Sequence, residues 1–222
     1  MPRIFVTACL LTFSLVVCSP CAYSQADPAA VVAFTLDFPT SQPEHYSIRI
    51  PYDGSAHYES AGRISSDSDE TDSFALEFPL TSATRQKIFE LAAKAGYFRK
   101  DVDSHHKGLA FTGKKTLTYK DARRTGECTY NYSTLPAVEE ITSLFQGLSA
   151  TLEFGHRLQY DHHYQKLALD EELKHMEQMA RDNQLIEVMA VRSILDQIIA
   201  DSTVINVTRS RAERLLEQFG AH

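Results

Sequence analysis

The apolar residues of this chain change their spacing at Pro136, and that change constrains the fold more than any other feature. From about residue 30 to residue 78, and again in a hairpin over about 109–133, they alternate with polar or small residues, as in strands with one buried face. From Pro136 onward they recur at three- and four-residue intervals, as in amphipathic helices. The sequence therefore predicts an α+β fold, in which an antiparallel sheet of about five or six strands with one mid-sequence helix precedes a helical C-terminal region. The expected division is a sheet part over 27–135 and a helical part over 136–222, packed on the sheet or on a partner.

Three apolar alternations before residue 79 predict the first strands. They cover 32–38, 46–52 and 74–78. Between the last two, residues 65–73 contain no apolar side chain and are expected to form a solvated acidic loop. This loop begins like a calcium-binding loop at Asp67, but the glycine and glutamate that such a loop needs at its sixth and twelfth positions are missing.

The pair Asp53-Gly54 predicts a hairpin after the second of these strands. A two-residue loop would mix apolar and polar residues on one face of the hairpin. A three-residue loop over 52–54, with Gly54 in the left-handed region, sets Ile48 opposite Tyr58 and keeps one face apolar. We therefore expect the three-residue loop.

A helix and a second hairpin are expected before the change of period. The helix is capped by Thr81 or Ser82 and stopped by Gly96. The hairpin has arms over about 109–120 and 126–133. Its second arm places three alternating residues on one face, and these are Cys128, Tyr130 and Tyr132.

The helical region is expected to hold three or four helices. The first has one apolar stripe, formed by Val138, Ile141, Phe145, Leu148, Leu152 and Gly155. Asp170 is expected to cap the second helix, and residues 185–199 to form a third, more apolar one. The segment Ser210-Arg-Ala-Glu213 has the pattern of a capping box that opens the last helix.

The first 26 residues have the pattern of a secretory leader. Arg3 supplies a positive charge, residues 4–17 are apolar, and 24–26 place small residues at the cleavage positions. We therefore expect cleavage near Ala26 and a secreted or periplasmic location. A lipoprotein is less favoured, because Val17 is bulky where the lipoprotein signal needs a small residue.

Composition narrows the function classes. Removal of 26 of the 222 residues leaves 196, which can bury a full core. It also removes three of the four cysteines and leaves Cys128 with no partner for an internal disulfide. The net charge is −7, or −8 without the leader's Arg3, and an acidic chain is not typical of nucleic-acid-binding proteins. No segment is long and apolar enough to predict a membrane span.

Basic residues gather on the second predicted hairpin of this acidic chain. They include the candidate partner-binding set, Lys114, Lys115, Lys120, Arg123 and Arg124, against a single acid, Asp121. Such a cluster can bind a protein or an anionic partner. It can equally be a charged sheet edge that deters aggregation.

Two Glu-x-x-His pairs, Glu153–His156 and Glu172–His175, are the candidate metal ligands. Residues three apart share a helix face, so each pair can offer one oxygen and one nitrogen. Di-iron carboxylate bundles add a glutamate from each of two further helices, and those glutamates are not evident here. The metal site is therefore kept as an alternative, and we expect no cofactor. Signatures of a serine hydrolase, a zinc protease or a phosphate loop are absent from the sequence.

Two short runs are similar to segments of known proteins. The first is His45-Tyr-Ser-Ile-Arg-Ile followed by Asp53-Gly54, and the second is Ala95-Gly-Tyr-Phe98 before the second hairpin. With these runs, residues 45–148 resemble an uncharacterised family of exported bacterial domains of unknown function. The resemblance covers about half of the chain and implies no activity.

The missing catalytic motifs and the basic hairpin lead us to expect an exported, non-catalytic protein that binds a protein or an anionic partner. One alternative is a metal-binding protein or metal-dependent enzyme that uses the two Glu-x-x-His pairs. The other is a structural or oligomerising module, which predicts an exposed apolar stripe over 185–199.

Overall fold

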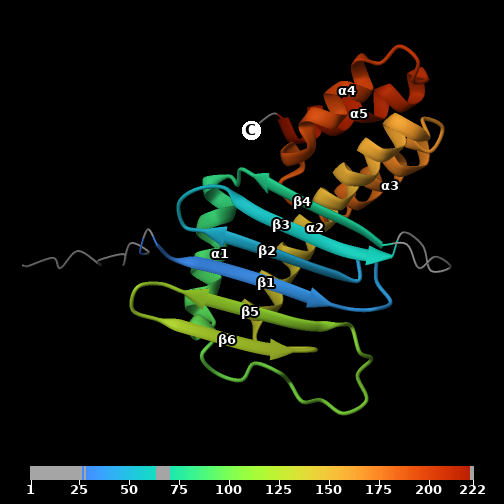
Figure 1. Ribbon diagram of the computed structural model, residues 1–222. Helices are drawn as coiled ribbons and strands as arrows, with labels where there is room; N and C mark the ends of the chain where they lie inside the picture. The colour runs from blue at the N-terminus through green and yellow to red at the C-terminus, as the bar shows by residue number, and fades with distance from the viewer. Residues whose placement is uncertain (1–26, 28, 64–70, 221–222) are drawn as a thin grey trace, which may run out of the picture.

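The structure is a computed structural model that describes residues 27, 29–63 and 71–220, so the predicted leader lies outside the described residues. Six strands form one antiparallel sheet in the order β4-β3-β2-β1-β5-β6 (Figure 1). They are β1 (Val31–Asp37), β2 (His45–Pro51), β3 (Ala56–Arg63), β4 (Thr71–Phe78), β5 (Lys114–Lys120) and β6 (Thr125–Tyr130). With the helices that follow, this sheet confirms the predicted α+β fold.

Strict alternation of burial along the strands gives the sheet one apolar face. In β1, Val32, Phe34 and Leu36 are buried, while the residues between them are partly exposed. The same alternation continues in β2 and in β5. Residues two apart point to the same side of a strand, so these side chains form one continuous core surface.

The β2–β3 hairpin has the predicted register. Ile48 pairs with Tyr58, and both side chains are fully buried. Gly54 has a φ of +99° in the turn, which a residue with a Cβ atom rarely adopts. The three-residue loop is therefore confirmed, because it keeps the apolar face of both strands on one side.

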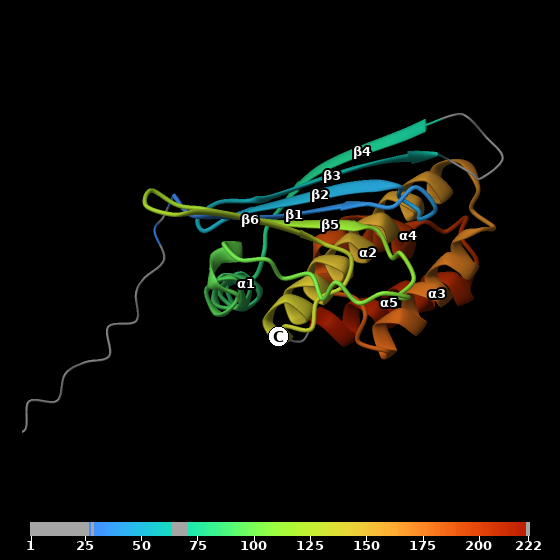
Figure 2. The ribbon, with the colours of Figure 1, turned by 90° about the horizontal axis from the view of Figure 1, so that it is seen from below.

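The helices all lie on one side of the sheet, as Figure 2 shows. They are α1 (Ser82–Lys94), α2 (Pro136–Tyr164), α3 (Leu169–Arg181), α4 (Arg192–Ala200) and α5 (Asn206–Gly220), with the 3₁₀ turns η1 (Gly96–Phe98) and η2 (Val188–Val191). Thr81 caps α1 as predicted, because its hydroxyl accepts the Thr84 N–H. Among the described residues, no helix is long and apolar enough to cross a membrane.

Helix α2 connects the sheet to the rest of the helical region. All six residues of its predicted apolar stripe are buried. The Phe145 ring stacks on Phe34 of β1, with ring centroids 5.1 Å apart, and the Thr142 hydroxyl lies 2.5 Å from the Tyr130 hydroxyl. The C-terminal half of α2 packs against α3. One helix therefore belongs to both the sheet core and the helical core.

An ion-pair network joins α3 to α5. Glu177 of α3 is largely buried and accepts hydrogen bonds from Arg211 at 2.7 Å and from Arg214 at 2.9 Å. Arg211 also donates to Asp170 at 2.9 Å, and the Thr208 hydroxyl donates to the same carboxylate at 3.2 Å. The network fixes two helices that are separated in sequence by α4.

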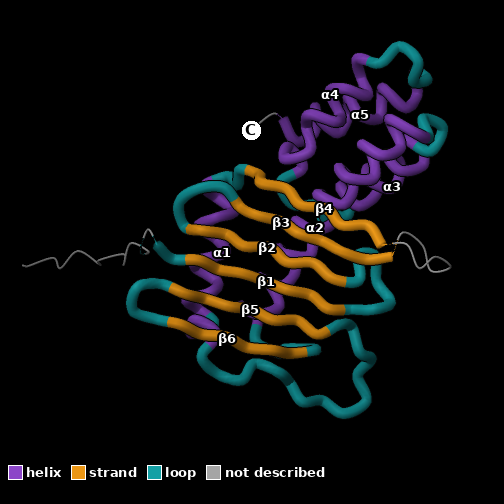
Figure 3. The backbone as a smooth tube through the Cα atoms, viewed as in Figure 1, coloured by secondary structure: helices purple, strands orange, loops and turns teal. Residues whose placement is uncertain are grey.

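Several predicted boundaries in the sheet part are wrong. Residues 71–73, predicted as loop, begin β4, where they pair with β3. The rest of the predicted loop, residues 65–70, lies outside the described residues. Residues 109–113 are not strand but belong to the connection 99–113, which lies beside the end of β6 (Figure 3). Tyr132 lies past the end of β6 and is exposed, unlike Cys128 and Tyr130.

Three predicted helix starts are also wrong. Asp170 lies in the first turn of α3 rather than at its cap, because its carboxylate is held by α5. Helix α5 begins at Asn206, so the predicted capping box lies inside it. Residues 185–187 are not helical, and the predicted single helix over 185–199 is η2 followed by α4.

The apolar stripe over 185–199 is buried within the monomer. Its buried members are Leu185, Val188, Val191, Ile194, Leu195 and Ile198. The exposed stripe expected of an oligomerising module is therefore wrong for this segment.

Candidate functional site

The five predicted partner-binding residues do not form one exposed patch. Lys114, Lys120 and Arg123 are exposed on β5 and the β5–β6 turn. Lys115 is only 5 % exposed, and Arg124 is engaged within the turn. Lys115 and Arg124 thus form contacts within the fold. Of the other three, Lys114 and Lys120 lie at opposite ends of β5, so the exposed cations are not one compact cluster.

Lys115 is a structural residue. Its Nζ donates to the Asn131 carbonyl at 2.9 Å, to the Thr112 hydroxyl at 2.8 Å and to the Thr112 carbonyl at 3.2 Å. Burial lowers the pKa of this ammonium group. The sequence already indicated that Lys115 is buried, because it alternates with Leu117 and Tyr119 on the buried face of β5.

We predict that Lys115→Ser lowers the free energy of unfolding by about 2 kcal/mol, because it removes the three hydrogen bonds that Lys115 donates to Thr112, before β5, and to Asn131, just beyond β6. Lys114→Ser, one residue away and exposed, should change it by less than about 0.5 kcal/mol. Urea denaturation of both variants checks this. Equal effects of the two substitutions would contradict the structural role of Lys115.

Arg124 is held by its own turn. Its guanidinium pairs with Asp121 at 2.8 Å and lies over the Tyr97 ring, 4.0 Å from the centroid. Burial raises the pKa of Asp121, but hydrogen bonds from the backbone N–H of Arg123, the Tyr119 hydroxyl and Arg124 outweigh it and lower that pKa to about 2. Arg124 therefore stabilises the β5–β6 turn.

The four predicted metal ligands do not converge. His156 stacks on Phe74 of β4 with ring centroids 4.3 Å apart, and its Nε2 lies 3.5 Å from Asp72. Within the described part of the chain, no three His, Cys, Asp or Glu side chains are close enough to hold a metal ion together. The two Glu-x-x-His pairs do not make the shared site that the metal alternative needs.

Three of those four residues nevertheless line one cleft, which we call the Glu153 cleft. It has a volume of about 560 Å³ and lies between the β1–β2 end of the sheet, α2 and α3. Its lining residues include Leu36, Tyr46, Ser149, Ala150, Glu153, Phe154, Arg157, Glu172, His175 and Met179.

Glu153 is the least exposed carboxylate of this cleft, at 9 %. Its Oε1 accepts hydrogen bonds from the Tyr58 hydroxyl and the Ser60 hydroxyl, both at 2.7 Å. Burial, followed by the charge of Glu153, raises the pKa of Tyr58 well above its usual value, so this hydroxyl keeps its proton and donates it. Tyr58 also lies 3.0 Å from Ser149. Two strand hydroxyls therefore hold one carboxylate of α2 in a fixed position.

At the other side of the cleft, Arg157 pairs with Glu172. The guanidinium Nε donates to Glu172 at 2.5 Å, and its carbon lies 4.7 Å from the centre of the Phe154 ring. The His175 ring meets Phe154 edge-on at 5.3 Å between centroids. The charges of Arg157 and Glu172 thus neutralise each other.

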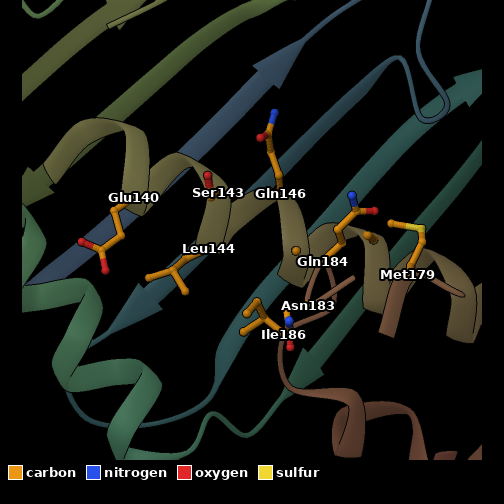
Figure 4. Close-up of a pocket in the computed structure, with 10 residues that line it drawn as sticks. Glu140, Ser143, Leu144, Gln146, Met179, Asn183, Gln184 and Ile186 are labelled. Atoms are coloured by element: carbon orange, nitrogen blue, oxygen red, sulfur yellow. The ribbon is translucent and has the colours of Figure 1, made fainter. Parts of the chain in front are cut away.

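A second hollow of about 540 Å³ adjoins the cleft along α2. It shares Gln146, Ala150 and Met179 with the Glu153 cleft. Figure 4 shows its walls, which come from α2 on one side and from the end of α3 and the segment after it on the other, including Gln184 and Ile186. The second hollow therefore continues the Glu153 cleft along α2.

Three members of the site were not predicted from the sequence, and these are Tyr58, Ser60 and Arg157. A signal existed for Ser60, because it is a polar residue in the inward register of β3. Arg157 follows His156 directly and belonged to no recognised motif.

The fold and this cleft define an α+β protein with an open antiparallel sheet and a cleft between that sheet, α2 and α3. Comparison with known proteins adds no closer class: no family model matches the chain, and a search of curated proteins finds no significant match. The resemblance of residues 45–148 to exported bacterial domains stays a prediction.

Proposed function

We propose that this protein is a non-catalytic binding protein that holds a small polar ligand in the Glu153 cleft. The observation that carries the proposal is a carboxylate that is nine-tenths buried yet lines an open cleft. A buried charge costs free energy of folding unless it is paired with an opposite charge, and a ligand can supply that charge. Among the described side chains, no Lys, Arg or His forms an ion pair with Glu153. Its position therefore favours a role in ligand binding.

The surroundings of Glu153 support a preformed site. Small-molecule sites are concave, with apolar walls and a few fixed polar groups. Here the apolar walls include Leu36, Phe154 and Met179, and the fixed polar groups are Glu153 and the Arg157–Glu172 pair. A ligand would find these groups already oriented, which reduces the entropy lost on binding.

The proposal is tested by a thermal-shift screen with and without a blocked cleft. The screen covers amines, amino acids, carboxylates, sugars and nucleosides. At least one class should raise the melting temperature of the native chain by a few degrees. Ala150→Phe places a ring where Ala150 lines both hollows and should abolish that shift.

Ala93→Phe is the matched control, because Ala93 is exposed on α1 and lies outside both hollows. This variant should keep the full response. If no class shifts the melting temperature, or if Ala150→Phe responds like the native chain, the cleft is not the binding site.

The proposal places the protein outside the cytoplasm, on the strength of the leader pattern in residues 1–26. A native mass spectrum of the protein from its own cells tests this part. A chain that begins at Asp27 supports export, whereas a chain that retains Met1 would overturn it. Binding of a partner by the predicted set of Lys114, Lys115, Lys120, Arg123 and Arg124 stays a separate prediction, and Lys114, Lys120 and Arg123 are its exposed members.

A further inference from the structure

One oxygen of the Glu153 carboxylate has no hydrogen-bond partner among the residues that the structure describes. Both hydrogen bonds to this side chain go to Oε1, and no described residue donates to Oε2. The enclosed side-chain polar atoms without a partner in the described part of the chain are Arg85 Nε and Arg209 Nε. Oε2 is not among these enclosed atoms, and Glu153 lines the cleft, so we expect a ligand in the cleft to reach this oxygen.

The charges around that oxygen select among ligands. Arg157 and Glu172 neutralise each other, so Glu153 is left as an unbalanced negative charge. An anionic group placed here would be repelled. A neutral donor would gain a hydrogen bond, and a cationic donor would gain a stronger, charge-assisted one.

We propose that the ligand of the Glu153 cleft carries a primary ammonium group, which donates a hydrogen bond to Glu153 Oε2. This inference rests on the proposed function and names the chemical class of its ligand. An ammonium group is compact and has three donors, so it can reach one carboxylate oxygen at the floor of a cleft. The apolar side chains of Leu36, Phe154 and Met179 fit a short hydrocarbon chain attached to it.

Three probes of the same size separate the possible ligand classes. They are n-butylammonium, butyrate and 1-butanol, each titrated into the purified chain by isothermal calorimetry. Butylammonium should bind at least roughly tenfold more tightly than the other two, since a hydrogen bond to a charged group contributes more than a neutral one. Glu153→Gln keeps an acceptor for Tyr58 and Ser60 but removes the charge, and it should cost roughly the same factor.

Glu90→Gln is the matched control, because it removes the same charge from an exposed position on α1. It should leave the affinity for butylammonium unchanged. A measurement on the native chain covers the case in which Glu153→Gln does not fold: bound butylammonium should give intermolecular NOE signals to the methyl groups of Leu36 and Met179.

The outcomes separate the inference from the proposed function. Equal or tighter binding of butyrate or 1-butanol, abolished by Ala150→Phe, would keep the cleft as a binding site and overturn the ammonium assignment. If none of the three probes binds, the ammonium assignment is overturned, and the broad screen decides the proposed function by itself. Tight binding of butylammonium that is insensitive to Glu153→Gln would also overturn the assignment.

Discussion

Gly126→Ala is expected to lower the free energy of unfolding by about 3 kcal/mol or more. A Cβ atom at this position of β6 would lie 1.9 Å from the Tyr97 carbonyl oxygen and 2.9 Å from Arg99 Cγ. Because the first of these atoms belongs to the backbone, a side-chain rotation cannot relieve the clash. The η1 turn would have to move away from the sheet and take the fully buried Phe98 with it.

Thermal unfolding of Gly126→Ala followed by circular dichroism checks this expectation. The control is Gly220→Ala at the end of α5, where a Cβ would meet only Met189 Cε at 3.9 Å. That change should cost almost nothing, since alanine is favoured over glycine in helices. Similar melting temperatures for the two variants would show that the contact between η1 and β6 is not as close as described.

Glu177→Ala is expected to cost about 3 kcal/mol, because it leaves Arg214 without its partner and Arg211 with Asp170 alone. The cost arises from the largely buried carboxylate that joins α3 to α5, not from the helix propensity of residue 177. Both arginines lie on α5, so the substitution should loosen that helix first. Urea denaturation and amide hydrogen exchange of α5 measure the two effects.

Glu171→Ala on the same helix is the matched control. Glu171 is exposed and lies 3.4 Å from Lys174, so its loss should cost less than about 0.5 kcal/mol. If Glu171→Ala destabilised the protein as much as Glu177→Ala, burial of the α3–α5 network would not be the cause.

Local patterns predicted the sheet because they reflect the forces that form it. The alternation of Val32, Phe34 and Leu36 follows from burial of one strand face, and it can be recognised in the sequence without knowing the partner strands. The β2–β3 register could be predicted because only one loop length keeps Ile48 and Tyr58 on the apolar face. The strand order could not be predicted in this way, because β1 pairs with β5, and three strands and α1 lie between them in the sequence.

Predictions failed where a tertiary contact outweighed a local motif. The Ser210–Glu213 capping box is correct as a pattern, but Thr208 is buried against Asp170 and the helix starts earlier, at Asn206. In the same way, charge alone grouped Lys115 with its exposed neighbours. Its alternation with Leu117 would have placed it on the buried face.

Three residues of the candidate site were singled out from the sequence, but for another role and without their partners. Glu153, Glu172 and His175 were singled out as metal ligands by their spacing, and they do line one cleft. The partners that determine the chemistry of Glu153 are Tyr58 and Ser60, which precede it by more than ninety positions. No local pattern connects residues so far apart, so only the fold could identify the hydroxyl pair.

The strand order also determines how the chain must assemble. Strands β1 to β4 are sequential neighbours, and so are β5 and β6, so each group can form from short-range contacts. The two groups meet along one seam, where Val31 pairs with Lys120 and Asp37 pairs with Lys114. Closing that seam brings together the ends of a long intervening segment, and the entropy of that loop closure is lost before its hydrogen bonds form. We therefore expect the slowest step in building the sheet to be the pairing of β1 with β5, inside the sheet rather than at either edge.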